Sequence, residues 1–196
     1  MVIADEGQLV QRSQKGDLGA FNALVEAYQR QVYNLCLRML GSAAAEDAAQ
    51  EAFITAYRRL DSFRGGSFRA WLLRIAANNC CDELRRQRSR PAASLEAALE
   101  AGSPADISSH SAGPEEEALR RELGRHLQQG LAVLPTEQRL AIILRDIHGL
   151  SYEELTEALG CSLGTVKSRI ARARSRMREY LMARRELLPS QFRLKE

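Results

Sequence analysis

Apolar residues recur three and four positions apart along most of the chain, and no useful length of sequence alternates with period two. This pattern predicts an almost wholly helical protein. In the N-terminal half it predicts a helix that is capped by Asp17 and ends at Gly41, followed by helices over about 44–60 and 67–88.

The sequence changes character in the middle of the chain. Residues 91–114 are rich in Ala, Ser, Gly and Pro with scattered acids, and they lack periodicity, which is typical of a flexible linker. After this segment, leucines at helical spacing predict a helix up to Pro135, and a further helix ends near Gly149. We therefore predict an all-α fold with two small helical domains, 1–90 and 115–196, joined by the linker.

The C-terminal half contains the signature of a helix-turn-helix. Ser151 followed by Glu154 is a capping-box pattern that opens a short helix, and Gly160 ends it. Ser162 caps the next helix. Two helices joined by a turn this short form a helix-turn-helix, whose second helix enters the major groove of DNA.

A helical wheel separates the faces of that second helix. The stripe that must face the core consists of Val166, Ile170, Ala173 and Met177. The opposite face carries Ser168, Ala171, Arg172 and Ser175, mostly short side chains that allow close approach to base edges. The flanks are basic, with Lys167, Arg174 and Arg178 on one side and Arg169 and Arg176 on the other.

Charge is distributed unevenly, although the net charge is only +3. Residues 167–178 hold six Lys or Arg and no acid, whereas 91–118 hold acids and no Lys or Arg. An Arg-rich helix is often merely solvated, but here it follows a capped turn, which favours contact with nucleic acid. If five cations each neutralise a phosphate, log affinity falls against log salt with a slope of roughly −4 to −5.

Other function classes find little support. No stretch reaches the ~20 apolar residues of a membrane span, and acids near the start argue against a secretory signal, so we expect a cytoplasmic protein without stable membrane association of its own. The four cysteines form no CxxC pair, which favours buried thiols over a redox or metal role. No catalytic motif is recognisable, and we expect neither an enzyme nor a bound cofactor or metal.

The segment LSYEELTEALGCSLGTVKSRIARAR is similar over its whole length to the promoter-reading region of extracytoplasmic-function sigma factors. The resemblance implies that the reading face of its second helix meets the upstream, minus-thirty-five promoter element. The residues predicted to bind this element are Thr165, Lys167, Ser168, Arg169, Ala171, Arg172, Arg174 and Arg176.

The segment DAAQEAFITAYRRLDSF resembles the part of the family that docks on the coiled coil of the RNA polymerase β′ subunit. The predicted polymerase-binding residues are Asp47, Gln50, Glu51 and Arg58. The alternative is an ordinary solvated face, although like charges four residues apart on a helix cost a little stability that a basic partner would restore. By the same resemblance, the C-terminal domain sits on the flap of the β subunit.

The segment FRGGSFRAWLLRIAANNCCDELRRQR looks like the family's strand-opening and downstream, minus-ten recognition segment. In the family, its Gly-rich loop captures a base turned out of the duplex. The predicted contacts to this element and the melted strand are Phe63, Arg64, Gly65, Gly66, Ser67, Trp71, Arg74, Asn78 and Arg85. For Trp71, core packing is an equally good explanation.

Taken as a whole, the resemblance implies a sigma factor that binds core RNA polymerase, recognises both promoter elements and promotes strand opening. Double- and single-stranded promoter DNA and an anti-sigma protein are the further partners it implies. The alternative is a stand-alone helix-turn-helix regulator, which would bind duplex DNA without polymerase. Transcription with purified core enzyme separates these two hypotheses.

Overall fold

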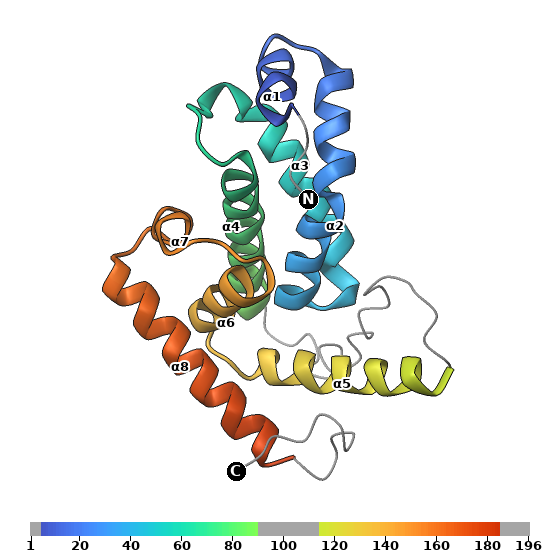
Figure 1. Ribbon diagram of the computed structural model, residues 1–196, viewed down its shortest axis with the longest axis vertical. Coiled ribbons are helices and arrows are strands. Elements are labelled where there is room, and N and C mark those ends of the chain that lie inside the picture. Colours follow the sequence, from blue (N-terminus) through green and yellow to red (C-terminus); the bar gives the residue numbers. More distant parts are fainter. Residues whose placement is uncertain (1–4, 90–113, 185–196) are drawn as a thin grey trace.

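The computed structural model describes residues 5–89 and 114–184, which are helical throughout their regular elements, without a strand (Figure 1). The N-terminal unit comprises α1 (Glu6–Gln14), α2 (Leu18–Leu40), α3 (Ser42–Arg58), the 3-10 turn η1 (Leu60–Ser62) and α4 (Phe68–Ser89). The C-terminal unit comprises α5 (Pro114–Ala132), α6 (Thr136–Ile142), the π-helical turn η2 (Ile143–Ile147), α7 (Tyr152–Leu159) and α8 (Leu163–Met182). The predicted all-α fold is confirmed, while the predicted linker lies almost entirely outside the described residues.

The long helix α2 organises the N-terminal unit. The Asp17 side chain accepts a hydrogen bond from the Ala20 amide at 3.0 Å, as its predicted N-cap role requires, and Gly41, with φ 84°, follows the last turn. The buried face of α2 packs against α3 and α4 through Leu24, Val32 and other apolar residues. The three predicted helices of this half are confirmed, with ends within a few residues of those expected.

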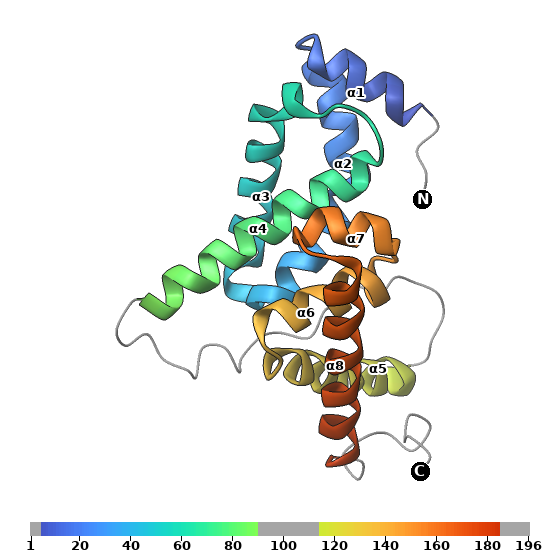
Figure 2. The ribbon, with the colours of Figure 1, turned by 90° about the vertical axis from the view of Figure 1, so that its left-hand side faces the viewer.

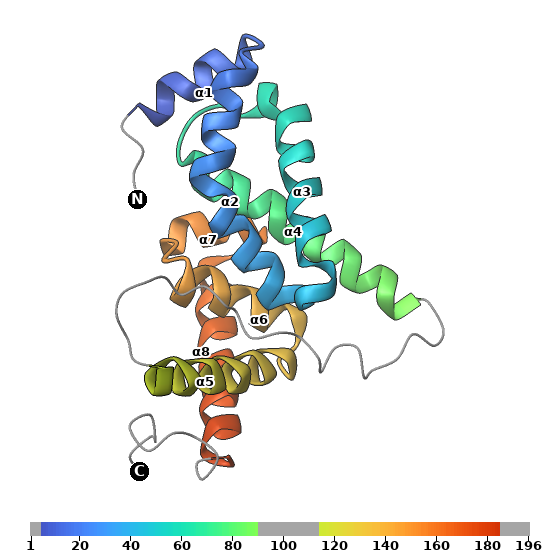
Figure 3. The ribbon, with the colours of Figure 1, turned by 90° about the vertical axis from the view of Figure 1, so that its right-hand side faces the viewer.

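Helix α1 was not predicted from the sequence. It lies across the start of α2 (Figure 3) and buries only Val10 and Ser13. The Tyr28 hydroxyl of α2 donates a hydrogen bond to the Glu6 carboxylate, and burial together with this hydrogen bond raises the pKa of Tyr28. Contacts between distant parts of the chain therefore hold this short helix in place.

The C-terminal unit packs α8 against α6 and α5. Gly130 of α5 sits at the crossing with α8, where a Cβ atom would lie 2.8 Å from the Met177 thioether. A glycine inside a helix costs about 1 kcal/mol relative to alanine, and here it permits this close approach.

The two units pack directly against each other. Helix α7 lies beside α4 (Figure 2), and α5, α6 and η2 contact α2. Their apolar interiors join into one continuous cluster of buried side chains. The sequence predicted two small helical domains joined by a linker and gave no sign of this contact.

Candidate nucleic-acid interface

The predicted turn between α7 and α8 forms as expected. The Ser151 hydroxyl accepts from the Glu154 amide at 3.1 Å, and the Glu154 carboxylate accepts from the Ser151 amide at 2.8 Å, so the capping box is complete. Gly160 ends α7 in the left-handed region at φ 60°. The Ser162 hydroxyl then accepts from the Thr165 amide at 3.3 Å and starts α8. These local contacts fix the angle at which α8 leaves the turn.

Helix α8 lies at the edge of the molecule, with α5 and α6 on one side (Figure 1). Val166, Ile170 and Ala173 are buried against them, whereas Met177 is only half-buried. The opposite face is open to solvent at Lys167, Ala171, Arg172 and Ser175, while Ser168 is half-buried. The predicted reading face is therefore presented outward on a helix that is anchored from behind.

The arginines on the flanks of α8 hold the helix to its own unit. The Arg174 guanidinium donates to both carboxylate oxygens of Asp146, at 2.6 and 2.9 Å, and this pairing raises the pKa of Arg174. Arg169 pairs with Glu137 at 2.5 Å and has a side chain only 20% exposed. Two of the predicted DNA contacts are thus held by carboxylates of the same unit.

The remaining basic side chains of α8 are freer. Arg176 donates to the neutral Gln138 side chain at 3.2 Å, and the Lys167 ammonium lies 5.8 Å from the centre of the Tyr152 ring. Arg172 and Arg178 are exposed and make no ion pair with a residue in the described part of the chain. The basic side chains of α8 therefore fall into two groups. Some pair with neighbouring carboxylates, and the others are available to bind DNA.

The exposed face of α3 carries the four residues predicted to meet a protein partner. These are Asp47, Gln50, Glu51 and Arg58, all exposed. Ile54 lies among them and is 44% exposed, an apolar side chain that the sequence reasoning did not single out although it sits three residues after Glu51. Tyr57 is 40% exposed, and its ring forms an edge-to-face pair with that of Phe21, with centroids 4.9 Å apart.

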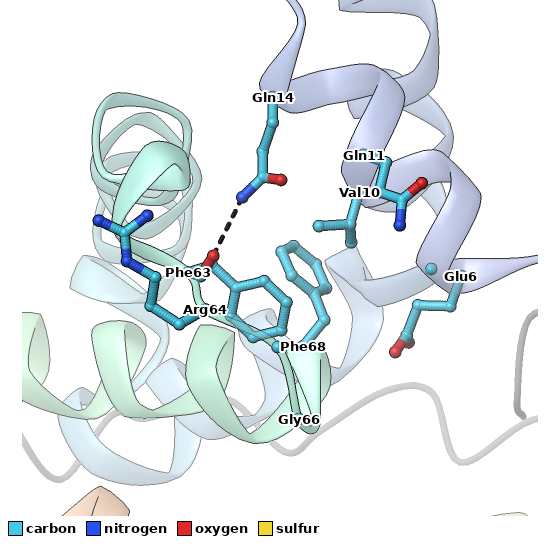
Figure 4. A pocket seen from close by; sticks show the side chains of 10 residues that line it. Glu6, Val10, Gln11, Gln14, Phe63, Arg64, Gly66 and Phe68 are labelled. Atoms are coloured by element: carbon cyan, nitrogen blue, oxygen red, sulfur yellow. Dashed lines mark hydrogen bonds between the residues drawn. The ribbon is translucent and has the colours of Figure 1, made fainter.

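A pocket of about 470 Å³ opens between α1 and the Gly-rich loop 63–67 (Figure 4). Its walls are apolar at Phe63 and Phe68 and polar at Gln11 and Arg64. The Gln14 side chain fixes the loop by donating to the carbonyl oxygens of Leu60 and Phe63, at 3.0 and 3.1 Å.

Two glycines give this loop its shape. Gly65 and Gly66 have φ of 103° and 88°, in the left-handed region that side chains disfavour. A Cβ at either position would meet nothing within 4 Å, so the backbone conformation, and not a lack of space, favours glycine here. The sequence drew attention to the loop but not to α1, which forms the opposite wall.

The aromatic residues after the loop form a cluster. The ring centres of Phe63, Phe68 and Trp71 lie 5.5 to 5.7 Å apart, and Trp71 is half-buried in the cluster. Farther along α4, Arg74 is half-buried, whereas Asn78 and Arg85 are exposed. The indole is therefore packed, while the stripe beyond it stays open to solvent.

The four cysteines do not gather at this surface. Cys36 and Cys80 are fully buried with sulfur atoms 3.6 Å apart, and the hydrogen bond with Cys36, together with burial, raises the pKa of Cys80. Cys81 and Cys161 are half-buried. No cluster of three or more His, Cys, Asp or Glu that could hold a metal occurs within residues 5–89 and 114–184. None of the helices there is long and apolar enough to cross a membrane.

Comparison with known proteins decides the family. Residues 24–90 match the family described as Sigma-70 region 2, and residues 125–177 match Sigma-70, region 4. The chain is 46% identical over 173 residues to the ECF RNA polymerase sigma-E factor of Escherichia coli K12, an alignment that covers 85% of this chain and 88% of that protein. The chain belongs to the ECF family of RNA polymerase sigma factors.

Two solved structures are similar to this one over most of its length. CnrH in complex with the cytosolic domain of CnrY has a TM-score of 0.64 and 26% identity, covering 89% of this chain and 96% of that chain. The sigma factor RpoE in complex with the anti-sigma factor NepR from Bartonella quintana has a TM-score of 0.61 and 28% identity, covering 82% and 96%. This ECF sigma factor is thus a promoter-recognising subunit of RNA polymerase. Its match to region 2 begins within α2, so α1 lies outside the matched residues.

Proposed function

We propose that the ECF sigma factor divides promoter recognition between its two units, 1–90 and 115–196, which the linker 91–114 connects. The outward face of α8 reads the upstream element through Lys167, Ser168, Ala171 and Arg172. The observation that carries this assignment is the exposure of that face on a helix anchored at its back and flanks. A preorganised helix loses little entropy when it enters the groove.

At the downstream element, a base turned out of the duplex enters the pocket between α1 and loop 63–67. The aromatic wall of Phe63 and Phe68 offers stacking surface, Gln11 offers hydrogen-bonding groups, and Arg64 at the rim offers a charge for the phosphate. Asn78 and Arg85 continue the path of the melted strand along α4. Trp71 contributes mainly by supporting the aromatic wall.

The exposed face of α3 docks on core polymerase. Asp47 and Glu51 supply acids for a basic partner, and Ile54 between the polar residues supplies apolar area at the centre of the patch. The C-terminal unit rests on the β flap in this arrangement. An anti-sigma protein is a further partner, as in the complex of the sigma factor RpoE with NepR.

The chemistry of RNA synthesis belongs to the polymerase in this proposal, and the sigma factor itself catalyses no reaction and needs no cofactor. It acts where polymerase and promoter DNA are, in the cytoplasm. A stand-alone regulator would need neither the α3 face nor the pocket.

The experiment that tests the division compares Arg172→Ala and Asn78→Ala in reconstituted holoenzyme. Arg172→Ala should weaken binding to the promoter duplex by roughly tenfold, because a good bidentate base contact is worth about 1–3 kcal/mol. Asn78→Ala should leave duplex binding unchanged and lower the fraction of open complexes, which permanganate footprinting of unpaired thymines measures. Arg125→Ala, another exposed arginine of the C-terminal unit, serves as the control.

Equal losses by the two variants in both assays would contradict the division. Failure of the wild-type holoenzyme to start transcripts on any genomic template would contradict the proposed function itself.

A further inference from the structure

Helix α1 presents one stripe of side chains to the pocket beside the Gly-rich loop 63–67. Glu6, Val10 and Gln14 follow one another at a spacing of four residues, which places them on the same side of the helix. All three line the pocket. The match to Sigma-70 region 2 begins at residue 24, so α1 forms this wall from outside the matched residues.

This helix is tied to α2 near both of its ends. Close to its start, the Glu6 carboxylate accepts the hydrogen bond from the Tyr28 hydroxyl. Close to its end, Arg12 forms an ion pair at 2.7 Å with Asp17, the N-cap residue of α2. Between these contacts, Val10 is buried. Helix α1 is therefore a fixed support beside the loop.

The loop has few contacts of its own that would hold its shape. Gly65 and Gly66 stand in open space, since no atom lies within 4 Å of a Cβ built on either. Glycine also has the greatest backbone freedom of all residues. In the turn before the loop, the Phe63 amide donates to the Leu60 carbonyl, only three residues earlier, at 3.1 Å. Such a loop needs a contact from a neighbouring element to keep one shape.

The Gln14 amide supplies that contact. Its nitrogen donates to the carbonyl oxygens of Leu60 and Phe63, at 3.0 and 3.1 Å, so both amide protons are used on the backbone that leads into the loop (Figure 4). The Phe63 carbonyl belongs to the peptide that joins this residue to Arg64. The Phe63 ring stands in the pocket wall, 5.7 Å from the ring of Phe68 between centres. Fixing this one peptide therefore fixes both the aromatic wall and the start of the loop.

We propose that Gln14 is a positioning residue for base capture, whose amide holds loop 63–67 in the shape that receives a base turned out of the duplex. The inference rests on the proposed function of this pocket. Turning a base out of the stack already costs free energy, and a preformed pocket avoids the further cost of ordering the loop. Gln14 should therefore change how much one base contributes to binding, and not how the C-terminal unit binds the upstream duplex.

The test measures the contribution of each base of the non-template strand in the complete holoenzyme. Single-stranded oligonucleotides carry the downstream element of a promoter from which the wild-type holoenzyme starts transcripts, with an abasic site placed at each position in turn. Fluorescence anisotropy gives the ratio of the affinity for the intact strand to that for each abasic strand. A change in the overall charge of the protein alters both affinities alike and leaves this ratio unchanged.

Three variants separate the amide from the rest of the side chain. Gln14→Met removes the donor but keeps the length of the side chain, whereas Gln14→Lys keeps a donor that can reach the two carbonyls. Gln8→Met is the matched control, because it makes the same change at an exposed position of α1 that does not line the pocket. Circular dichroism checks that every variant keeps its helices.

In wild type, Gln14→Lys and Gln8→Met, loss of the captured base should weaken binding roughly tenfold, the contribution of one stacked base. In Gln14→Met the same loss should weaken binding less than about threefold, because the two hydrogen bonds that order the loop are gone, and the other positions should respond as in wild type.

A ratio at the captured base that Gln14→Met leaves at the wild-type value would overturn the proposal while the function of the pocket stands. An equal reduction of the ratio at every position would also overturn it, because a general loss of structure has that effect. If wild type has no position at which removal of the base weakens binding, the proposed function of the pocket fails, and the role of Gln14 fails with it.

Discussion

The ion pair between Arg174 and Asp146 makes a quantitative prediction about DNA binding. The sequence predicts about five phosphate contacts from α8, but carboxylates of the same unit hold Arg169 and Arg174. The four other cations, Lys167, Arg172, Arg176 and Arg178, would give a slope of log affinity against log salt of about −3.6 at about −0.9 per phosphate. Asp146→Asn releases Arg174. When the holoenzyme binds a promoter fragment, the slope of log affinity against log salt should therefore steepen by about 0.9, and binding at 0.1 M salt should be roughly eightfold tighter.

The matched control is Glu157→Gln, which removes one exposed acid of α7 that pairs with none of the α8 arginines. The Arg174 and Asp146 side chains are 54% and 32% exposed, so their pair contributes at most about 1 kcal/mol and Asp146→Asn should remain folded. If Asp146→Asn and Glu157→Gln have the same slope, Arg174 does not reach a phosphate after release, and the reasoning is wrong. A slope that is flatter in Arg174→Ala than in wild type would show instead that the ion pair breaks on binding.

Two further predictions concern stability. Burial, with Arg69 and Arg38 nearby, lowers the pKa of His148 to about 4, so the folded state keeps this imidazole neutral while the unfolded chain protonates it near pH 6.5. The stability that this neutral imidazole contributes is therefore complete above pH 6.5 and is lost as the pH falls towards 4. Urea unfolding should show a loss of about 2 kcal/mol at pH 5, and His148→Gln should flatten this dependence of the unfolding free energy on pH. Ser151→Ala removes the cap of α7 and should cost about 1 kcal/mol in the same assay, whereas a loss below about 0.3 kcal/mol would show that the capping box contributes little.

The helix-turn-helix could be predicted in detail because its determinants are local. Ser151, Glu154, Gly160 and Ser162 act on backbone groups within four residues, and the apolar stripe of α8 repeats with the helical period. The predicted faces of α8 follow from that period alone. Short-range capping and periodicity are the signals that a single sequence carries best.

The parts that could not be predicted depend on partners far away in the chain. Helix α1 buries little apolar surface of its own, and Gln14 reaches carbonyls 46 and 49 residues later. Arg174 meets its carboxylate 28 residues earlier. Each of these side chains reads as a solvated residue in the sequence, because nothing in its local pattern marks the distant partner.

The hydrogen bonds that join the two units are made mainly to backbone carbonyls, and their net contribution to stability is small. A hydrogen bond between an amide or guanidinium and a carbonyl contributes only about 1–2 kcal/mol net, since both groups bind water when apart. The four such contacts that Gln128, Arg139 and Arg69 make are opposed by four buried polar atoms without partners, which cost about 1–3 kcal/mol each. The polar part of the interface is therefore near balance, and the apolar side chains that both units contribute to one buried cluster hold the units together.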